Sequence, residues 1–303
     1  MKGGGDVAEG QIRQSLSGFY DVMTTSGRLV RTRARGNFRS RKITPLVGDQ
    51  VVIDAPNDHE GYILEVKPRR NQLVRPPVAN VDQAIVATAV REPVFSTNLL
   101  DRQLLALEIA KIEPVVYLTK TDLLTAEEQP EFVQLAADYR QIGYQVIYDP
   151  VAFSQTAITA LDELLEDKVS VIMGQTGAGK STLLNHVAPD LDLATGEISA
   201  ALNRGKHTTR RVSLLEVAGG LIADTPGFSS YDAFDLDARS LGQYFREFRR
   251  AAVNCRFRGC VHVNEPGCAV KAMVESGEIR QSRYENYLLL YQALKNQKPN
   301  YRK

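Results

Sequence analysis

GQTGAGKS, residues 174–181, connects the apolar segment VSVIM (169–173) to STLLNHV (181–187). A strand, a glycine-rich turn with G-x-x-x-x-G-K-S spacing and a helix, in this order, are typical of a P-loop. In such a loop, backbone N–H groups surround phosphate oxygens, the lysine bridges the terminal phosphates and the serine hydroxyl reaches Mg²⁺. A chance glycine-rich turn is the alternative, but it would not need a strand before it and a helix after it. The sequence therefore predicts a nucleotide-binding α/β domain.

The phosphate site is expected to include a second segment. LIADTPG (221–227) places Asp224 at the end of another strand, where its carboxylate can hold Mg²⁺ through water, and the Gly227 amide can meet the γ-phosphate. Ser181 is the expected direct Mg²⁺ ligand, and Lys180 is assigned to catalysis because it bridges the phosphates. The loop residues expected to bind nucleotide are Gly174, Gln175, Thr176, Gly177, Ala178, Gly179, Lys180, Ser181 and Thr182.

TKTD, residues 119–122, follows the apolar segment PVVYL and predicts the base specificity. A carboxylate at Asp122 can accept hydrogen bonds from N1–H and from the exocyclic amine of guanine, a pair that adenine does not offer in this arrangement. Lys120 is expected to pack along the base and ribose, and Thr121 lies between Lys120 and Asp122 in the sequence. Thr119 replaces the Asn of the commoner N-K-x-D form. An aspartate that only caps a helix is the alternative. Because the motif ends a strand in a chain with a P-loop, we favour guanine recognition.

The order of these motifs is circularly permuted. The base motif precedes the phosphate loop by about 55 residues, whereas in ordinary GTPases it follows the loop. A parallel sheet keeps the site in either order, because ligands bind outside the carboxyl ends of the strands whatever the connections between them.

A longer series of motifs resembles the circularly permuted GTPases that depend on the small ribosomal subunit (RsgA/YjeQ type). In chain order the series is KITPLVGD (42–49), RPP (75–77), NVDQA (80–84), TKTD, GQTGAGKS, GKHTTR (205–210), DTPGFSS (224–230) and a cysteine cluster. The resemblance covers nearly the whole chain. It implies an N-terminal OB-fold β-barrel, a circularly permuted P-loop GTPase domain and a C-terminal helical zinc-binding domain, with GTP hydrolysis stimulated by the 30S subunit during late assembly.

Two positions depart from the pattern of that family. Thr176 stands where the family usually has Ser, and the stretch around Tyr148 and Asp149 lacks the usual Ser-Ser, which normally helps to cradle the base.

The pattern along the chain agrees with a multidomain α/β protein. Residues 11–75 contain short alternating segments separated by Gly, Pro, Asn and Asp turns, which predicts a small β-barrel. From 81 to about 227, apolar strands alternate with amphipathic helices, and the remainder is helical. We expect domains at 1–75, 76–232 and 233–303.

The polar stretch RGKHTTRR (204–211) is expected to become ordered around the γ-phosphate and Mg²⁺. Thr208 or Thr209 is the expected Mg²⁺-sensing hydroxyl. Phe228 stands where Ras-like proteins carry the Gln that positions water, so another group must orient it. His207 is the candidate catalytic residue, since a neutral imidazole can accept a hydrogen bond from the attacking water; a loop histidine without a catalytic role is the alternative.

The cysteines cluster with one histidine in a C-x4-C-x-H-x5-C pattern: Cys255, Cys260, His262 and Cys268. Their odd number and close spacing favour a metal over disulfides in a reducing compartment. Thiolate and imidazole donors suit tetrahedral Zn²⁺, and four protein ligands leave no position for catalytic water. We predict one structural zinc per chain, with reduced cysteines in a helical core as the alternative.

The front of the chain is basic. Residues 1–75 carry 13 Lys and Arg against 8 Asp and Glu, in a chain of net charge +1. Cations and one aromatic residue concentrate at Arg28, Arg31, Arg33, Arg35, Phe38, Arg39, Arg41 and Lys42. Such a barrel face can follow a phosphate backbone and stack a base, although charge that only protects a strand edge is the alternative. With the resemblance, 16S rRNA of the 30S subunit is the expected partner, and DNA is not.

No apolar run approaches the ~20 residues of a membrane span, and the first residues lack a signal-peptide core. We therefore expect a cytoplasmic protein without a membrane partner, and a monomer. Two functions compete: a GTPase that times ribosome assembly, and an RNA-docking scaffold for which GTP or GDP is only a ligand. Lys180, Ser181 and Asp224 favour the enzyme. Asp122 disfavours a third possibility, a metabolic P-loop kinase.

Overall fold

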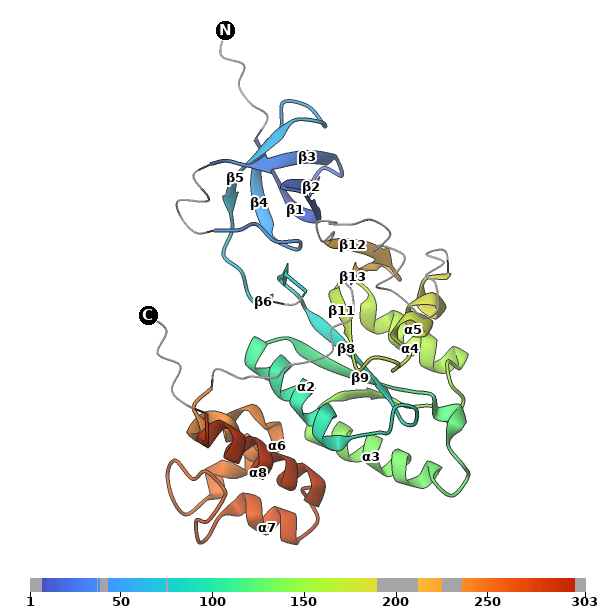
Figure 1. Cartoon of the computed structure of the whole chain (residues 1–303), viewed down its shortest axis with the longest axis vertical. Coiled ribbons are helices and arrows are strands. Elements are labelled where there is room, and N and C mark those ends of the chain that lie inside the picture. Colours follow the sequence, from blue (N-terminus) through green and yellow to red (C-terminus); the bar gives the residue numbers. More distant parts are fainter. Residues whose placement is uncertain are drawn as a thin grey trace.

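The computed structural model describes residues 7–36, 38, 43–74, 76–189, 212–224 and 236–297. A small barrel lies at one end of the molecule, an α/β domain lies in the middle, and a helical domain packs beside the α/β domain at the other end (Figure 1).

The barrel is built from five described strands, β1 (Val7–Leu16), β2 (Phe19–Thr24), β3 (Leu29–Ala34), β4 (Gln50–Asp54) and β5 (Gly61–Val66). They pair in the order β1-β2-β3-β5-β4, and a further β1–β4 pairing closes the barrel. Alternate side chains of β2, β3 and β4 point inward and are buried, as the period of a strand requires. This arrangement confirms the predicted OB-type barrel.

Strand β1 changes partners along its length. Its first half pairs with β4, whereas Gln14 and Ser15 pair antiparallel with β12 (Val212–Val217) of the α/β domain. A register irregularity between Ile12 and Gln14 separates the halves, and such a bulge bends a strand and alters its direction. The barrel and the α/β domain therefore share one continuous sheet in the described part of the chain.

The α/β part of this sheet has the order β10-β9-β8-β11-β13-β12, in which only β12 runs antiparallel to its neighbour. Its parallel strands are β8 (Gln83–Ala89), β9 (Glu113–Thr119), β10 (Gln145–Ile147), β11 (Val169–Met173) and β13 (Gly220–Asp224). The central strands β8 and β9 are buried on both faces, as expected for parallel strands covered by helices. A separate ribbon of β6 (Gln72–Leu73) and β7 (Val78–Ala79) follows the barrel.

Helices cover both faces of this sheet. One face carries α2 (Thr97–Ala110) and α3 (Gln129–Ile142), whose apolar side chains join the core cluster that continues into the barrel. The other face carries α4 (Gln155–Leu165) and α5 (Lys180–Val187) over a second cluster. The sequence explains two helix starts, because the Ser96 and Ser154 side chains accept hydrogen bonds from backbone N–H groups in the first turns of α2 and α4.

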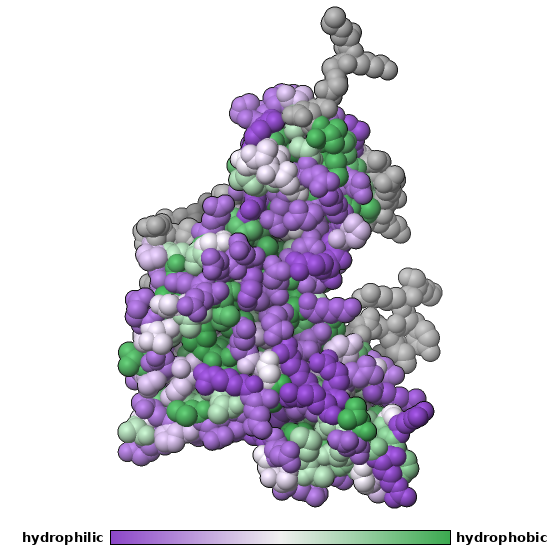
Figure 2. Space-filling model, turned by 180° about the vertical axis from the view of Figure 1, so that it is seen from behind, coloured by the Kyte–Doolittle hydropathy of each residue, from purple (hydrophilic) through white to green (hydrophobic). Residues whose placement is uncertain are grey.

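The C-terminal domain consists of several short helices and the longer α8 around a third apolar cluster, to which Leu105 and Ala106 of α2 also belong. Its elements are η3 (Ala238–Tyr244), α6 (Arg246–Ala251), η4 (Ala252–Asn254), α7 (Ala269–Glu275) and α8 (Gln281–Lys295). On the face that Figure 2 shows, hydrophilic residues cover most of the coloured surface and apolar residues form small separate patches. Among the described helices, none combines the length and apolarity that crossing a membrane requires.

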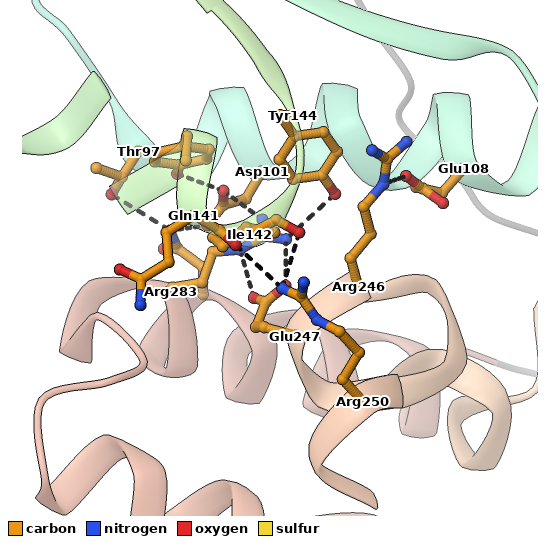
Figure 3. A network of polar contacts seen from close by, with 12 residues as sticks. Thr97, Asp101, Glu108, Gln141, Ile142, Tyr144, Arg246, Glu247, Arg250 and Arg283 are labelled. Carbon is orange, nitrogen blue, oxygen red and sulfur yellow. Dashed lines mark hydrogen bonds and ion pairs between the residues drawn. The ribbon is translucent and has the colours of Figure 1, made fainter. Parts of the chain in front are cut away.

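A buried polar network joins this domain to α2 (Figure 3). The guanidinium of Arg283 lies 2.5 Å from Asp101 and 2.8 Å from Glu247, and all three side chains are almost fully buried. Asn286 and Tyr139 donate hydrogen bonds of 2.7 and 2.6 Å to the same aspartate. The domain contact therefore combines a buried ion-pair network with apolar packing against α2.

Candidate nucleotide and metal sites

The phosphate loop lies at the carboxyl edge of the central sheet, between β11 and α5. Gly174 has φ +145°, and a Cβ there would lie 2.1 Å from the carbonyl oxygen of Ala87 in β8. Gly177 and Gly179 have φ of +81° and +82°, in the left-handed region that favours glycine. The glycine spacing of the motif therefore has a local structural reason at each position.

Lys180 begins α5, and its ammonium points back into the loop. Its Nζ donates hydrogen bonds to the carbonyl oxygens of Gly174 and Gln175 at 2.9 and 2.8 Å. Burial lowers the pKa of Lys180; a bound polyphosphate would oppose this shift by stabilising the cation. Ser181 follows in the first turn of the same helix.

The base motif lies beside the phosphate loop although 59 positions separate the two in sequence. The Thr119 hydroxyl donates a buried hydrogen bond of 2.7 Å to the carbonyl oxygen of Ala178. Thr119 thus makes a direct link to the loop where other GTPases carry Asn. This contact brings Asp122 and Lys180 to the same edge of the sheet.

The remaining residues of the base motif differ in exposure. Asp122 is exposed in η1 (Thr121–Leu123), so its carboxylate is accessible to a ligand. Thr121 is buried, and its hydroxyl has no hydrogen-bond partner among the described residues. Lys120 has φ +60°, and its Nζ donates to the carbonyl oxygen of Glu92.

The segment that departs from the family pattern faces the same place. Asp149 and Phe153 line a small pocket together with Thr119, Lys120 and Thr121. Asp149 accepts hydrogen bonds from the Val151 N–H and the Ser154 hydroxyl, at 2.8 and 2.7 Å. Its carboxylate therefore holds the loop before α4 in a defined turn.

The predicted magnesium ligands lie only partly in the described chain. Ser181 lies in the first turn of α5 and Asp224 ends β13, so backbone positions at the sheet edge agree with a shared site. Ser213 of β12 pairs with Asp224 on one side and with Gln14 of the barrel on the other. His207, Thr208, Thr209, Gly227 and Phe228 lie outside the described residues.

The Cys₃His cluster is assembled as its spacing predicted. The donor atoms of Cys255, Cys260, His262 and Cys268 lie within 4.8 Å of one another. His262 Nδ1 is 3.7 Å from the Cys255 sulfur and 3.4 Å from the Cys268 sulfur. In a tetrahedral zinc site the N–S edges are about 3.6 Å long, given the usual bond lengths. The four side chains therefore fit a zinc ion.

The surroundings of the cluster agree with metal binding. Burial lowers the pKa of His262, which keeps a neutral imidazole available as a ligand. Burial also raises the pKa of the Cys260 thiol to about 12, so a thiolate there needs a bound cation at neutral pH. Tyr284 and Tyr287 donate hydrogen bonds to the backbone carbonyls of His262 and Val261, at 2.8 and 2.7 Å. Side chains of α8 thus orient the ligand segment.

The basic face of the barrel is more neutralised than the sequence indicates. Ion pairs to acidic residues elsewhere in the barrel hold three of its arginines: Arg28 with Asp58, Arg31 with Asp21, and Arg35 with Asp54. Arg33 has no acidic partner among the described residues, and its guanidinium lies 4.3 Å from the centre of the Phe19 ring. Arg39, Arg41 and Lys42 lie outside the described residues.

The position of Phe38 contradicts its expected role in stacking a base. Phe38 is only 3% exposed and belongs to the barrel core, so its ring offers no face for stacking a base. Phe19 is a half-buried aromatic residue on the basic face and pairs directly with Arg33 across β2 and β3. Strand alternation across the Ser17-Gly18 hairpin was the signal that could have identified it.

Comparisons with known proteins agree with this geometry. The model of the RsgA GTPase family matches residues 66–234, and the model of the RsgA N-terminal domain matches residues 9–63. The chain is 62% identical over 294 residues to the small ribosomal subunit biogenesis GTPase RsgA 1 of Lactiplantibacillus plantarum, covering 97% of this chain and 98% of that protein. It is 52% identical to RsgA of Enterococcus faecalis over 295 residues, with coverage of 97% and 98%.

Two solved structures share the fold over the full length. YloQ, described as a circularly permuted GTPase, is 41% identical and superposes with a TM-score of 0.83, covering 99% of both chains. YjeQ from Thermotoga maritima is 33% identical with a TM-score of 0.84, covering 97% of this chain and 100% of that one. With these relatives, the permuted motifs and the joined base and phosphate loops, the chain belongs to the RsgA family of circularly permuted GTPases.

Proposed function

We propose that this chain hydrolyses GTP as a biogenesis factor of the small ribosomal subunit. The observation that supports the proposal is the hydrogen bond from Thr119 to the carbonyl of Ala178, because it joins the expected base motif to the expected phosphate loop. The curated relatives are named small ribosomal subunit biogenesis GTPases. A cytoplasmic location follows from this role, since ribosomal subunits are the proposed partner.

In this proposal each nucleotide-site residue has a defined task. The loop 174–179 binds the phosphate oxygens through backbone N–H groups, and Lys180 neutralises their charge. Asp122 accepts the two guanine donors. Mg²⁺, when bound, neutralises charge that develops between the β- and γ-phosphates, and Ser181 and Asp224 would hold it together with Thr208 or Thr209. His207 would orient the attacking water, and Gly227 would contact the γ-phosphate.

Two further modules serve docking. We assign one structural zinc ion to Cys255, Cys260, His262 and Cys268, a set that fixes the fold of the C-terminal domain without catalysing a reaction. The barrel would contact 16S rRNA through Arg33 and Phe19 and through those neighbouring cations whose acidic partners are displaced by phosphate. Each chain would bind the subunit as a monomer.

The test is GTP turnover by the purified full chain with and without purified 30S subunits. Turnover alone should be slow, on the order of 10⁻⁴–10⁻² per second, as in unassisted GTPases. It should rise strongly with 30S subunits and stay low with 50S subunits as a matched control. Lys180→Ala, which removes the phosphate-binding ammonium, should abolish both rates. GDP binding without any hydrolysis would favour the scaffold function instead.

A further inference from the structure

One loop that carries none of the nucleotide motifs contacts both the base motif and the phosphate loop. It comprises residues 90–96, between β8 and α2, and is here called the clamp loop. Its first N–H, from Val90, donates a hydrogen bond of 3.1 Å to the carbonyl oxygen of Thr119 in the base motif. The clamp loop therefore begins at the edge of the sheet where the nucleotide is expected.

Arg91 fixes the clamp loop to the segment after the base motif. Its guanidinium donates a hydrogen bond of 3.2 Å to the carbonyl oxygen of Leu123 and forms an ion pair with Glu128. Glu128 also accepts a hydrogen bond of 2.9 Å from the Thr125 N–H. Both side chains of the ion pair are about two-fifths exposed, and such a pair adds little to stability. The ion pair instead fixes the position of the clamp loop relative to the base motif.

The other end of the clamp loop is fixed by packing. The Phe95 ring meets the Phe132 ring of α3 edge-on, with centroids 5.3 Å apart, and Ser96 caps α2. Both ends are thus held, which leaves the residues between them in one defined position.

Those middle residues reach both halves of the nucleotide site. The carbonyl oxygen of Glu92 accepts a hydrogen bond from the Lys120 ammonium. Pro93 lies against the phosphate loop, since its Cδ is 3.7 Å from the position of a Cβ on Gly177. Glu92 has φ +52°, an unfavourable conformation for a residue with a side chain, which persists only where neighbouring contacts impose it.

We propose that the clamp loop positions Lys120 for guanine nucleotides, with Arg91 as the positioning residue. The Glu92 carbonyl holds the ammonium of Lys120, so the four-carbon stem of this lysine is held between the base motif and the clamp loop. A base and ribose bound there meet a stem that is already ordered, and binding does not have to restrict it. Arg91 acts on this contact through the backbone of the loop.

The kinetic signature follows from where the stem acts. Lys120 contacts the base and ribose, which are the same in GTP, in GDP and in the transition state. Loss of its order weakens all three states equally, so KM and the GDP Kd rise while kcat is unaffected. This inference rests on the proposed guanine site.

The experiment measures the GDP Kd with a fluorescent GDP analogue, together with KM and kcat for GTP, in four variants of the full chain. Arg91→Ala should raise the Kd and KM about tenfold and keep kcat within about twofold. Lys120→Met removes the ammonium that the clamp holds. The double variant should bind GDP no more weakly than Lys120→Met alone, because both changes remove the same contact. Arg70→Ala is the matched control, since Arg70 pairs with Asp82 just before β8, at the opposite edge of the sheet.

Each other outcome contradicts the inference. Arg91→Ala with the affinity of Arg70→Ala would show that the clamp loop does not hold Lys120. Additive losses in the double variant, or a fall in kcat together with the melting temperature, would reduce Arg91 to a structural role. Wild-type protein that does not bind GDP at all would overturn the guanine site itself, which distinguishes the two failures.

Discussion

Arg283 of α8 and Asp101 of α2 form an ion pair of 2.5 Å in which the two side chains are 2% and 0% exposed. The pair joins residues 182 positions apart and bridges the C-terminal and α/β domains (Figure 3). Arg283 also contacts Glu247, and its guanidinium lies 4.5 Å from the centre of the Phe245 ring. The cation is thus enclosed by two anions and an aromatic face.

Arg283→Met should loosen the C-terminal domain, because it leaves Asp101 and Glu247 buried without a counter-charge. Removing one partner of a buried pair costs about 3–5 kcal/mol. Hydrogen exchange of the α8 amides should show a fall in opening free energy of that size. Arg280→Ala is the control, since Arg280 forms a more exposed domain-bridging pair with Asp138 and should cost about 0–1 kcal/mol. Equal effects of the two variants would contradict the special role of the buried pair.

Asp122→Asn should change base preference. An amide can donate a hydrogen bond to the 2-oxo group of xanthine, whereas a carboxylate accepts from the 2-amino group of guanine. Competition between GDP, XDP and ADP should show preference for GDP in the wild type and a shift toward XDP in the variant. Binding of ADP as tightly as GDP by the wild type would disprove guanine recognition at Asp122.

Removal of the predicted zinc should unfold the C-terminal domain before the α/β domain. Binding by such a ligand set is worth about 10–16 kcal/mol in small zinc modules. Chelation, or Cys260→Ala, should increase hydrogen exchange in α7 and leave β11 protected. Metal analysis of the freshly purified chain should give one zinc per chain, and a zinc-free preparation with a folded α7 would refute the assignment.

Arg33→Ala should weaken binding to 30S subunits and make it less dependent on salt. Each lost phosphate contact lowers the slope of log K against log salt by about 0.7–0.9. Co-sedimentation over a range of salt concentrations measures this slope. Lys67→Ala is the control, because Lys67 pairs with Glu9 and lies outside the predicted face. If both variants behave alike, the basic face of the barrel is not an RNA contact.

His207→Ala should leave subunit binding nearly intact and remove most of the stimulated turnover. A partner that completes a GTPase site contributes about 10³–10⁵ in rate, and His207 is the proposed water-orienting group in this chain. The measurement is GTP turnover with 30S subunits beside co-sedimentation of the same variant. If 30S subunits stimulate GTP turnover of the variant as strongly as that of the wild type, His207 has no catalytic role and backbone or RNA groups orient the water.

The sequence alone determined the features that depend on short-range spacing. The glycines of 174–179 are required by positive φ angles and by the close approach of Ala87. Their spacing was therefore sufficient to predict the conformation of the loop. The cysteine cluster lies within 14 residues, and its spacing was sufficient to predict a tetrahedral ligand set. The order of strands and helices followed from the alternation of apolar segments, because each element is specified by its own period. The permutation followed from the order of the TKTD and GQTGAGKS motifs along the chain.

Tertiary structure decided the features that depend on which distant surfaces meet. The sequence around Phe38 does not indicate whether its ring lies in the core or on the surface. Closure of the barrel buries the Phe38 ring and leaves Phe19 beside Arg33. The acids that neutralise Arg28 and Arg35 come from the loop between β4 and β5 and from β4, respectively. The pairing of β1 with β12 and the Arg283–Asp101 contact join segments about 200 residues apart. Such contacts form only when separate elements pack together, so no local period or spacing encodes them.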